Sequence, residues 1–402
     1  MCGAMIQGHD ILCFAPGPWA DIWRNRHQIM TRLALGNRVL YVEPWAQLRP
    51  LLRQLRQGDR GASDSWQSWL RQVQPDLWVY HPPRWAPQLG SSRLAALTET
   101  IYMGLLRREL AKLGFERPIL WLYLPDMGNF AGKFGEKLLI YHIVDEYAGY
   151  AGVTESWRPV MQGMERDLAR RADLVFVSST SLFDRKRSLN PRTVLIRNAV
   201  DFPSFAAAAD AGTLPPVLAG LRRPIIGYVG AINEKIDLDL LLHVAHSMVE
   251  ATLLMVGSVS VMSEASRRTL IALQDASNVC FLGPKDVSEV PAYVAACDVC
   301  LLPYRTNEWT QNIDSLKSYE YLACGKPVVA TGVPTALQFG EVFRVASGAQ
   351  EFVAMIDEEL RTDTPDLRKK RQAIAAQNTW DHRIAQISQA IETTLNAKAS
   401  RC

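Results

Sequence analysis

The strongest constraint on this fold is an alternation of short β-rich runs with longer segments of helical periodicity. The alternation stops in a stretch rich in Ala, Pro and Gly and then starts again. Such alternation is typical of βα units that build parallel sheets, so two successive sheets are predicted. The runs occupy residues 9–15, 38–44, 76–82, 118–125, 137–144, 173–179 and 193–199, then 224–230, 251–257, 278–283, 298–303, 326–331 and 342–347.

The length also favours two domains, because 402 residues exceed what one hydrophobic core usually serves. We expect an α/β protein with two Rossmann-like domains facing each other across a cleft, and ligands outside the carboxyl ends of the strands. The expected parts are an N-terminal domain over 1–200, a linker over 201–223, a C-terminal domain over 224–379, and a last helix over 380–402 that packs back on the first domain.

Composition narrows the class of protein. No run approaches the ~18 uncharged apolar residues of a membrane-spanning helix, and the start lacks a basic region ahead of a long apolar segment, so a cytoplasmic location is expected. The seven cysteines favour buried thiols, and the Cys297-x-x-Cys300 spacing falls in a strand expected to be buried. Residues 1–200 carry 26 Lys and Arg against 18 Asp and Glu, a net +8, which suits an anionic partner or a merely solvated basic surface.

One helical stretch, residues 315–325, carries charge beside its apolar positions. Its start should open at the carboxyl edge of the second sheet, where backbone amides and the helix dipole favour phosphate. Lys317 adds a cation one turn in, and Glu320 can accept hydrogen bonds from vicinal hydroxyls such as those of a ribose. The alternative is that Lys317 and Glu320 form an exposed ion pair.

Five strings in the C-terminal half resemble, in order and spacing, the retaining GT-B glycosyltransferases of family four (glycosyl transferases group 1). They are "LIRNAVDFPSF", "IIGYVGAINEKIDLDLL", "NVCFLGP", "YVAACDVCLLPY" and "DSLKSYEYLACGKPVVAT". "IYHIVDEY" and "ADLVFVSSTSL" extend the resemblance more weakly into the N-terminal half, where it is closest to enzymes of surface-polysaccharide biosynthesis.

The resemblance implies a donor site for a nucleotide-diphosphate sugar. Glu320 matches the carboxylate that holds the ribose, and Lys317 with the amides of Ser315 and Leu316 would lie near the diphosphate. It further matches Gly230 and Lys235 to a phosphate-binding segment, and Gly283 and Lys285 to the border of the nucleobase. Two departures stand out: Ala231 replaces an arginine, and Asn312 replaces a glutamate that touches the donor sugar.

The acceptor side rests on weaker patterns. His142, Asp145 and Glu146 end a predicted strand, where such groups can orient or deprotonate an acceptor hydroxyl. Asp145 also resembles a recurring acidic position of the family. The alternatives are a helix cap for Asp145 and a packed, neutral ring for His142.

A second acceptor-side segment follows the first strand. The loop at Gly17 could approach phosphate, while Trp19, Trp23, Arg26 and His27 could line an acceptor pocket; Trp23 could equally be core.

No metal, cofactor or nucleic acid is expected. The "DLD" string at 237–239 imitates a metal motif, but Asp237 is better explained as a helix N-cap. His243 and His246 are three apart with no evident third ligand, so they are interpreted as surface residues. The resemblance also implies independence from metals.

Residues 47–60 combine a leucine face with a stripe of arginines, a pattern that suits an anionic membrane surface as well as a helix packed on its own domain. The overall expectation is a hexosyltransferase-like enzyme that moves a sugar, with retention, to a glycan or lipid-linked acceptor in polysaccharide or glycolipid biosynthesis. It would be cytoplasmic or peripheral at the inner face of the cell membrane. A non-hydrolysing nucleotide-sugar epimerase and a catalytically weak binding partner remain as alternatives.

Overall fold

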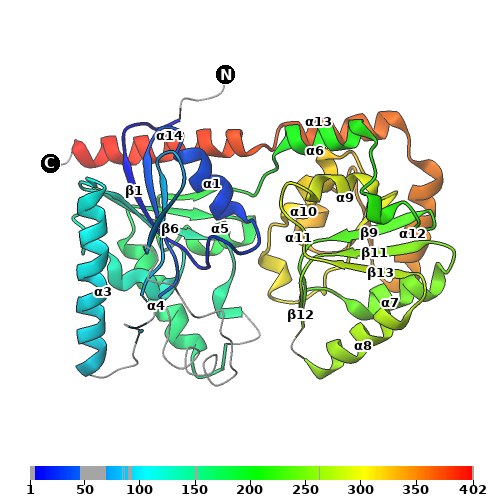
Figure 1. Ribbon diagram of the computed structural model, residues 1–402, viewed down its shortest axis with the longest axis horizontal. Coiled ribbons are helices and arrows are strands. Elements are labelled where there is room, and N and C mark those ends of the chain that lie inside the picture. The colour runs from blue at the N-terminus through cyan, green and yellow to red at the C-terminus, as the bar shows by residue number, and fades with distance from the viewer. Residues whose placement is uncertain are drawn as a thin grey trace. The chain divides into compact units, whose positions relative to one another are not determined.

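The computed structural model describes residues 5–45, 69–83, 85, 87–88, 93–149, 153–261 and 263–400. The chain forms two compact units (Figure 1). Unit 1 comprises residues 1–177, 183–195 and 384–402, and unit 2 comprises 178–182 and 196–383. The amphipathic segment 47–60 lies outside the described residues.

Unit 1 is built on an eight-stranded sheet in the order β3-β4-β2-β1-β5-β6-β7-β8. All neighbours are parallel except β3 and β4, which are antiparallel. The strands are β1 Asp10–Phe14, β2 Arg38–Val42, β3 Leu70–Gln74, β4 Leu77–Tyr80, β5 Ile119–Leu122, β6 Leu138–Ile143, β7 Leu174–Val177 and β8 Thr193–Leu195.

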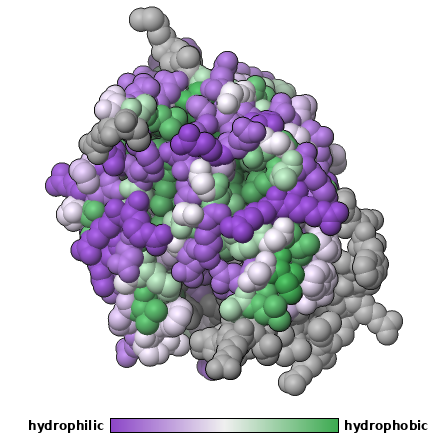
Figure 2. Space-filling view, turned by 90° about the vertical axis from the view of Figure 1, so that its left-hand side faces the viewer, coloured by the Kyte–Doolittle hydropathy of each residue, from purple (hydrophilic) through white to green (hydrophobic). Residues whose placement is uncertain are grey.

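The helices of unit 1 surround this sheet. They are α1 Asn25–Leu33, α3 Arg93–Lys112, η2 Pro125–Phe130, η3 Tyr147–Gly149 and α4 Arg158–Arg171; α5 Thr180–Lys186 and α14 Trp380–Ala399 each straddle a division between the units. Within unit 1, α14 is tied to the amino end of β7 by an ion pair of 2.6 Å between Lys398 and Asp173. On the face of unit 1 seen in Figure 2, hydrophobic residues form separate patches among hydrophilic ones. None of the helices in the described ranges combines the length and apolar character that crossing a bilayer requires.

Unit 2 contains a six-stranded parallel sheet in the order β13-β11-β9-β14-β15-β16. Counted in chain order this is 3-2-1-4-5-6, the Rossmann order, and its topological switch point lies between β9 and β14. The strands are β9 Ile225–Val229, β11 Thr252–Val256, β13 Val279–Gly283, β14 Val299–Leu302, β15 Val328–Thr331 and β16 Arg344–Ala346, with a small extra pair, β10 Ile232–Asn233 and β12 Val259–Ser260.

Helices cover both faces of this sheet. Figure 1 shows α7 Leu238–Ser247 and α8 Glu264–Asp275 on one face and α6 Phe202–Ala211, α9 Val290–Ala296 and α10 Leu316–Ala323 on the other. The remaining helices are η4 Pro216–Leu218, η5 Thr310–Asn312, α11 Pro334–Leu337, α12 Ala349–Thr362 and α13 Pro365–Ala376. Residues 201–223, expected to be a linker, instead contain α6, because "FPSFAAAADA" is rich in the strong helix former Ala.

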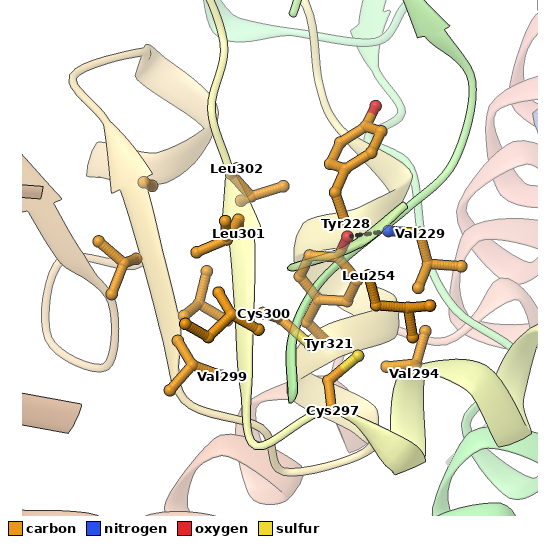
Figure 3. Close-up of a cluster of buried hydrophobic side chains, with 14 of the residues drawn as sticks. Tyr228, Val229, Leu254, Val294, Cys297, Val299, Cys300, Leu301, Leu302 and Tyr321 are labelled. Carbon is orange, nitrogen blue, oxygen red and sulfur yellow. Dashed lines mark hydrogen bonds between the residues drawn. The ribbon is translucent and has the colours of Figure 1, made fainter. Parts of the chain in front are cut away.

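The strands of unit 2 have nearly continuous hydrophobic sequences because helices cover both faces of their sheet. Figure 3 shows Tyr321 of α10 reaching β9, where its hydroxyl accepts a hydrogen bond of 3.0 Å from the Val229 amide. Cys297 and Cys300 are buried in the same cluster as free thiols. A Cβ on Gly227 would stand 2.1 Å from the Cys297 sulfur, so that glycine makes room for the thiol.

Candidate functional site

Three glycines lie at the carboxyl ends of neighbouring strands in unit 2. The Gly230 amide donates to the Val256 carbonyl at 2.7 Å, and the Gly257 amide donates to the Gly283 carbonyl at 2.8 Å. A Cβ on Gly257 would stand 2.1 Å from the Gly230 oxygen, and all three glycines have positive φ angles. The turns after β9 and β11 are therefore packed too closely for side chains. The sequence analysis had singled out Gly230 and Gly283 but missed Gly257.

The side chain of Lys317 lies across the backbone at Gly230, just after the end of β9. A Cβ on Gly230 would stand 1.8 Å from the Lys317 Cε and 2.2 Å from its Nζ, so this path exists only because position 230 lacks a side chain. The ammonium lies 5.4 Å from the centroid of the Tyr228 ring, a distance that permits a cation–π interaction. The structure thus brings Gly230 and Lys317 together at the switch point of the sheet.

Glu320 is half-buried one turn further along α10. Burial raises the pKa of its carboxyl, and the positive charge of Lys317 lowers it. The pKa of the buried Tyr228 and that of the buried Tyr304 are both raised, chiefly by burial and in part by the negative charge of Glu320. These four side chains therefore form one electrostatic cluster, which we call the strand-end cluster: Tyr228, Tyr304, Lys317 and Glu320.

The start of α10 is fixed by two hydroxyl groups. Ser315 is its N-cap residue, and its hydroxyl lies 2.8 Å from that of Tyr304. The Ser315 amide donates to the Thr335 hydroxyl at 3.0 Å. The expectation that this amide would bind a diphosphate is therefore corrected: in this buried environment a neighbouring side chain already satisfies it. Leu316, the first residue of the helix, is half-buried.

The two remaining cations expected at the donor site each lie over an aromatic ring. The Lys235 ammonium is 4.6 Å from the centroid of Trp309, and its charge lowers the pKa of Tyr304, which links it to the strand-end cluster. The Lys285 ammonium is 5.5 Å from the centroid of Tyr293 on α9. Ala231, which stands where the family has arginine, supplies a carbonyl that accepts from the Tyr228 hydroxyl at 2.9 Å.

Asn312 is buried rather than directed to solvent. Its amide nitrogen donates to the Glu308 carbonyl at 2.6 Å, and its amide oxygen accepts from the Ser181 hydroxyl at 2.7 Å. The residue that departs from the family pattern therefore links η5 to the first turn of α5 within unit 2.

Four aromatic and hydroxyl side chains that hold this site together were not predicted from the sequence: Tyr228, Tyr304, Trp309 and Thr335. Tyr304 follows the end of β14 almost directly, and Tyr228 lies two residues before Gly230. Both positions at the carboxyl ends of strands could have been noticed by the rule that ligands bind there. Trp309 and Thr335 carry no such signal, because only the folded loops bring them near Lys235 and Ser315.

In unit 1 the loop after β1 is supported by a buried arginine. The Arg26 guanidinium donates to the Tyr41 hydroxyl at 2.8 Å and pairs with Asp21 at 3.0 Å. The Tyr41 hydroxyl in turn donates to the Gly17 carbonyl at 2.8 Å, and a Cβ on Gly17 would stand 3.1 Å from Arg26. Arg26 is only 4% exposed, so it supports the Gly17 loop from beneath.

Aromatic rings pack beside this support. The centroids of Trp19 and His27 are 5.0 Å apart, and those of Trp23 and His27 are 4.8 Å apart. His27 is fully buried, and burial together with the charge of Arg26 lowers its pKa to about 4. The residues expected to line an acceptor pocket are thus gathered in one place, with His27 neutral and enclosed while Trp19 and Trp23 are half-buried.

His142 is a core residue, which corrects its assignment to catalysis. It lies inside β6, is 1% exposed, and is enclosed by Trp121, Tyr123 and Phe176 at centroid distances between 5.0 and 5.7 Å. Burial lowers its pKa to about 3, so the ring is neutral. The physical reason is that β6 is buried on both faces, so even a polar side chain on it is enclosed.

Asp145 and Glu146 follow β6 at its carboxyl end and have different surroundings. One Asp145 carboxylate oxygen accepts from the Glu146 amide at 3.0 Å. Glu146 pairs with Arg185 at 3.0 Å and Lys186 at 3.5 Å, and Lys186 also pairs with Glu165. The Glu146 carboxylate is therefore already engaged in an ion cluster of unit 1, which binding an acceptor would have to disturb.

The metal-like motif has a structural explanation. Asp237 caps α7, because its carboxylate accepts from the Leu240 amide at 3.1 Å. Asp239 accepts from the Thr269 hydroxyl at 2.7 Å. His243 is half-buried and His246 is exposed on the same helix. In the part of the chain that the structure describes, no group of three or more His, Cys, Asp or Glu side chains is placed to hold a metal ion.

The ion cluster makes a testable prediction about Lys186. Burial raises the pKa of Glu165, and Lys186 lowers it, so Lys186→Met leaves a buried carboxylate without its cation. We expect a loss of about 3 to 5 kcal/mol of unfolding free energy at pH 8. The penalty belongs to the ionised form, so it exists above the folded-state pKa and disappears as the pH falls through it.

Urea unfolding at pH 8 and pH 5 measures both the loss and its sign. The matched control is Arg187→Met, since Arg187 pairs with Asp184 at 3.7 Å on the surface and should contribute below about 1 kcal/mol. Equal stability of the two variants at pH 8 would show that the cluster is not structural and that Glu146 is free to serve an acceptor.

Comparisons with known proteins agree with this geometry. Residues 223–361 match the family model of the glycosyl transferases group 1. The chain is 28% identical over 286 residues to TuaH of Bacillus subtilis, named as a teichuronic acid biosynthesis glycosyltransferase, covering 68% of this chain and 71% of TuaH. It is 25% identical over 195 residues to a D-inositol 3-phosphate glycosyltransferase of Mycobacterium sp. (strain JLS), covering 46% of this chain and 43% of that protein.

Solved structures share the fold over nearly the whole chain. Sucrose-phosphate synthase from Thermosynechococcus elongatus has a TM-score of 0.69 at 19% identity, covering 97% of this chain and all of that one. Anabaena Alr3699/HepE, solved in complex with UDP, has a TM-score of 0.67 at 16% identity, covering 96% and 100%. The chain is therefore similar to the glycosyl transferases group 1 over residues 223–361, and it shares the two-domain GT-B fold of these solved structures over nearly its whole length.

Proposed function

We propose that this enzyme transfers a sugar from a nucleotide-diphosphate sugar to an acceptor hydroxyl, with retention of the anomeric configuration, in the biosynthesis of a polysaccharide or glycoconjugate. The observation that carries the proposal is the position of Lys317 over Gly230 with Glu320 one turn away. These groups meet at the switch point of the unit 2 sheet, where open α/β sheets bind ligands.

The chemistry of the strand-end cluster fits such a donor. A nucleotide-diphosphate leaving group departs when cations stabilise its developing negative charge, so a preorganised electrostatic site can supply much of the catalysis. Lys317 would provide that charge, and the Glu320 carboxylate can accept hydrogen bonds from the two hydroxyls of a ribose. We assign no metal to this reaction.

The structural neighbours suggest which nucleotide to test first. Anabaena Alr3699/HepE was solved with UDP and with UDP-glucose. Uridine diphosphate is therefore the natural first probe for unit 2. Retention, which follows from the family resemblance, is tested by NMR of the anomeric configuration of the product.

The name of TuaH suggests the acceptor class. TuaH is named for teichuronic acid biosynthesis, which supports a growing glycan or a lipid-linked glycan as acceptor here. On the acceptor side, we assign Asp145, which follows the carboxyl end of β6, to orient or deprotonate the hydroxyl.

A catalytically weak binding protein is the second candidate, and Asn312 favours it. Both ends of its amide are engaged by Ser181 and Glu308, where the family places a glutamate on the donor sugar. An epimerase would need several acid and base groups around the sugar, and the 142–146 segment would supply only Asp145. Product analysis separates the three outcomes: transfer, an isomerised donor, or binding without turnover.

Glu320→Ala should weaken binding of UDP by about 1.5 to 3 kcal/mol, because hydrogen bonds to a charged group are lost while the fold remains. Isothermal titration calorimetry measures the change. Glu341→Ala is the control, since Glu341 is 64% exposed and pairs only with a surface lysine, Lys370, at 3.4 Å among the ion pairs described. An affinity within twofold of the original protein would remove Glu320 from the ribose site.

Asp145→Asn should lower turnover by about 100-fold or more while UDP affinity stays near normal, because this change affects proton transfer or orientation and not donor binding. Steady-state kinetics with UDP-sugar and an acceptor glycan, together with calorimetry, separate the two effects. Parallel losses of UDP affinity and of thermal stability would instead mark Asp145 as a structural residue.

We also propose that the enzyme works in the cytoplasm, docked peripherally on an anionic membrane through residues 47–60. The +8 charge of residues 1–200 supports this, because each basic residue near an anionic surface contributes about 1 kcal/mol. Co-sedimentation with vesicles containing phosphatidylglycerol at low salt should pellet the protein, and changing Arg49, Arg53 and Arg56 to Glu should release it. Protein left in the supernatant, or a variant that still pellets, argues against this segment.

A further inference from the structure

Two of the segments by which the chain passes between the units are joined inside unit 2. After the short stretch 178–182, the chain re-enters unit 2 at Ile196 and leaves it after Arg383. The Arg383 guanidinium donates to the Arg197 carbonyl at 3.1 Å and to the Asn198 carbonyl at 3.3 Å. Two residues later, the Val200 amide donates to the Asn378 carbonyl at 3.1 Å. The entering and leaving segments therefore form one hydrogen-bonded pair.

Asp314 attaches this pair to α10. Its carboxylate accepts from the Asn198 amide at 2.6 Å, and its carbonyl accepts from the Asn198 side chain at 2.5 Å. The other carboxylate oxygen accepts from the Tyr319 hydroxyl at 3.0 Å. Asp314 directly precedes the N-cap residue Ser315, and Tyr319 lies between Lys317 and Glu320 in the chain. The first turn of α10 is thus held at both ends by one carboxylate.

This carboxylate is costly to bury. Asp314 is 8% exposed, and burial raises its pKa to about 6 despite its hydrogen bonds from Asn198 and Tyr319 and the nearby charges of Arg197 and Arg383. Because the folded-state pKa lies above the usual value, ionised Asp314 lowers stability at neutral pH. A carboxylate that is costly to ionise here nevertheless accepts hydrogen bonds from Asn198 and Tyr319, and this geometry points to a positioning role.

We propose that Asp314 is a positioning residue for donor binding: it fixes the start of α10, and with it Lys317 and Glu320, to residues 196–200 and 378–383, where the chain re-enters and leaves unit 2. The link to the donor rests on the function proposed above, whereas the clamp itself is a property of the fold. Any displacement of α10 would then be transmitted to residues 196–200 and 378–383, and the reverse.

Hydrogen exchange of the ligand-free full chain tests the clamp without any donor. Asp314→Leu should speed exchange about tenfold in peptides covering 196–200, 378–383 and 315–319, whereas Asp314→Asn should stay within about threefold. The control Asp298→Leu removes a carboxylate that accepts from the Ile225 amide at 2.7 Å at the other end of the sheet, and it should leave all three peptides unchanged. Acceleration confined to 315–319, or none, overturns the clamp.

Calorimetry with UDP tests the positioning role. At pH 8, Asp314→Leu should bind UDP at least about tenfold more weakly, with Asp314→Asn restoring most of the affinity. As the pH falls from 8 to 5, the original protein should lose UDP affinity relative to Asp314→Asn, because a protonated Asp314 cannot accept both hydrogen bonds. The ratio of the two UDP affinities is compared because the titration of UDP itself affects both proteins equally. An affinity of Asp314→Leu equal to the original, or a ratio constant with pH, overturns the proposal.

Hydrogen exchange and calorimetry test the clamp and the donor assignment independently. If the original protein does not bind UDP, the donor assignment fails, and the exchange data still decide the clamp. If Asp314→Leu does not fold, hydrogen exchange of the original protein is compared with that of Asp314→Asn at pH 8 and pH 5. The exchange rates of the original protein should approach those of Asp314→Asn at pH 5. If the rates do not converge, the proposal is overturned.

Discussion

The candidate site in unit 2 depends on the absence of a side chain at Gly230. Lys317 lies where a Cβ of residue 230 would be, and its ammonium rests over the Tyr228 ring. Any other residue at 230 would push the lysine away from the end of β9. This single contact sets the position of the cation, and α10 then places Glu320 one turn beyond it.

Because helices cover both faces of the unit 2 sheet, a ligand is expected at the carboxyl ends of its strands. Gly230 and Tyr304 lie at the carboxyl ends of the two strands that flank the switch point, and Gly257 follows the neighbouring strand β11. Hydroxyl groups of Tyr304 and Thr335 fix Ser315, and Tyr321 fixes β9 against the same helix. A rigid core thus supports a small set of charged side chains, which is how a preorganised site avoids reorganisation when charge develops on a leaving group.

The sequence predicted the architecture well because strands covered on both faces leave a strong signal. Each expected run coincides with a strand; in the part of the chain that the structure describes, β3 and the two-residue strands β10 and β12 were not foreseen. The residues that the sequence assigns to a donor site, Gly230, Lys317 and Glu320, do lie near one another in the structure, since their spacing is kept in the motif. Two predictions were wrong because they depend on burial, which the motif does not show. His142 has a residue type suited to catalysis but lies inside β6, and the Ser315 amide already donates to the Thr335 hydroxyl. Asp314 went unnoticed because its partner Asn198 lies far away in sequence.

The most direct test of the account is a crystal structure of the full chain with UDP bound. The account predicts the ribose hydroxyls within hydrogen-bond distance of the Glu320 carboxylate and a diphosphate oxygen beside the Lys317 ammonium, next to Gly230. Density for UDP elsewhere, with Lys317 still over Tyr228 and Glu320 without contact to the ribose, would contradict it.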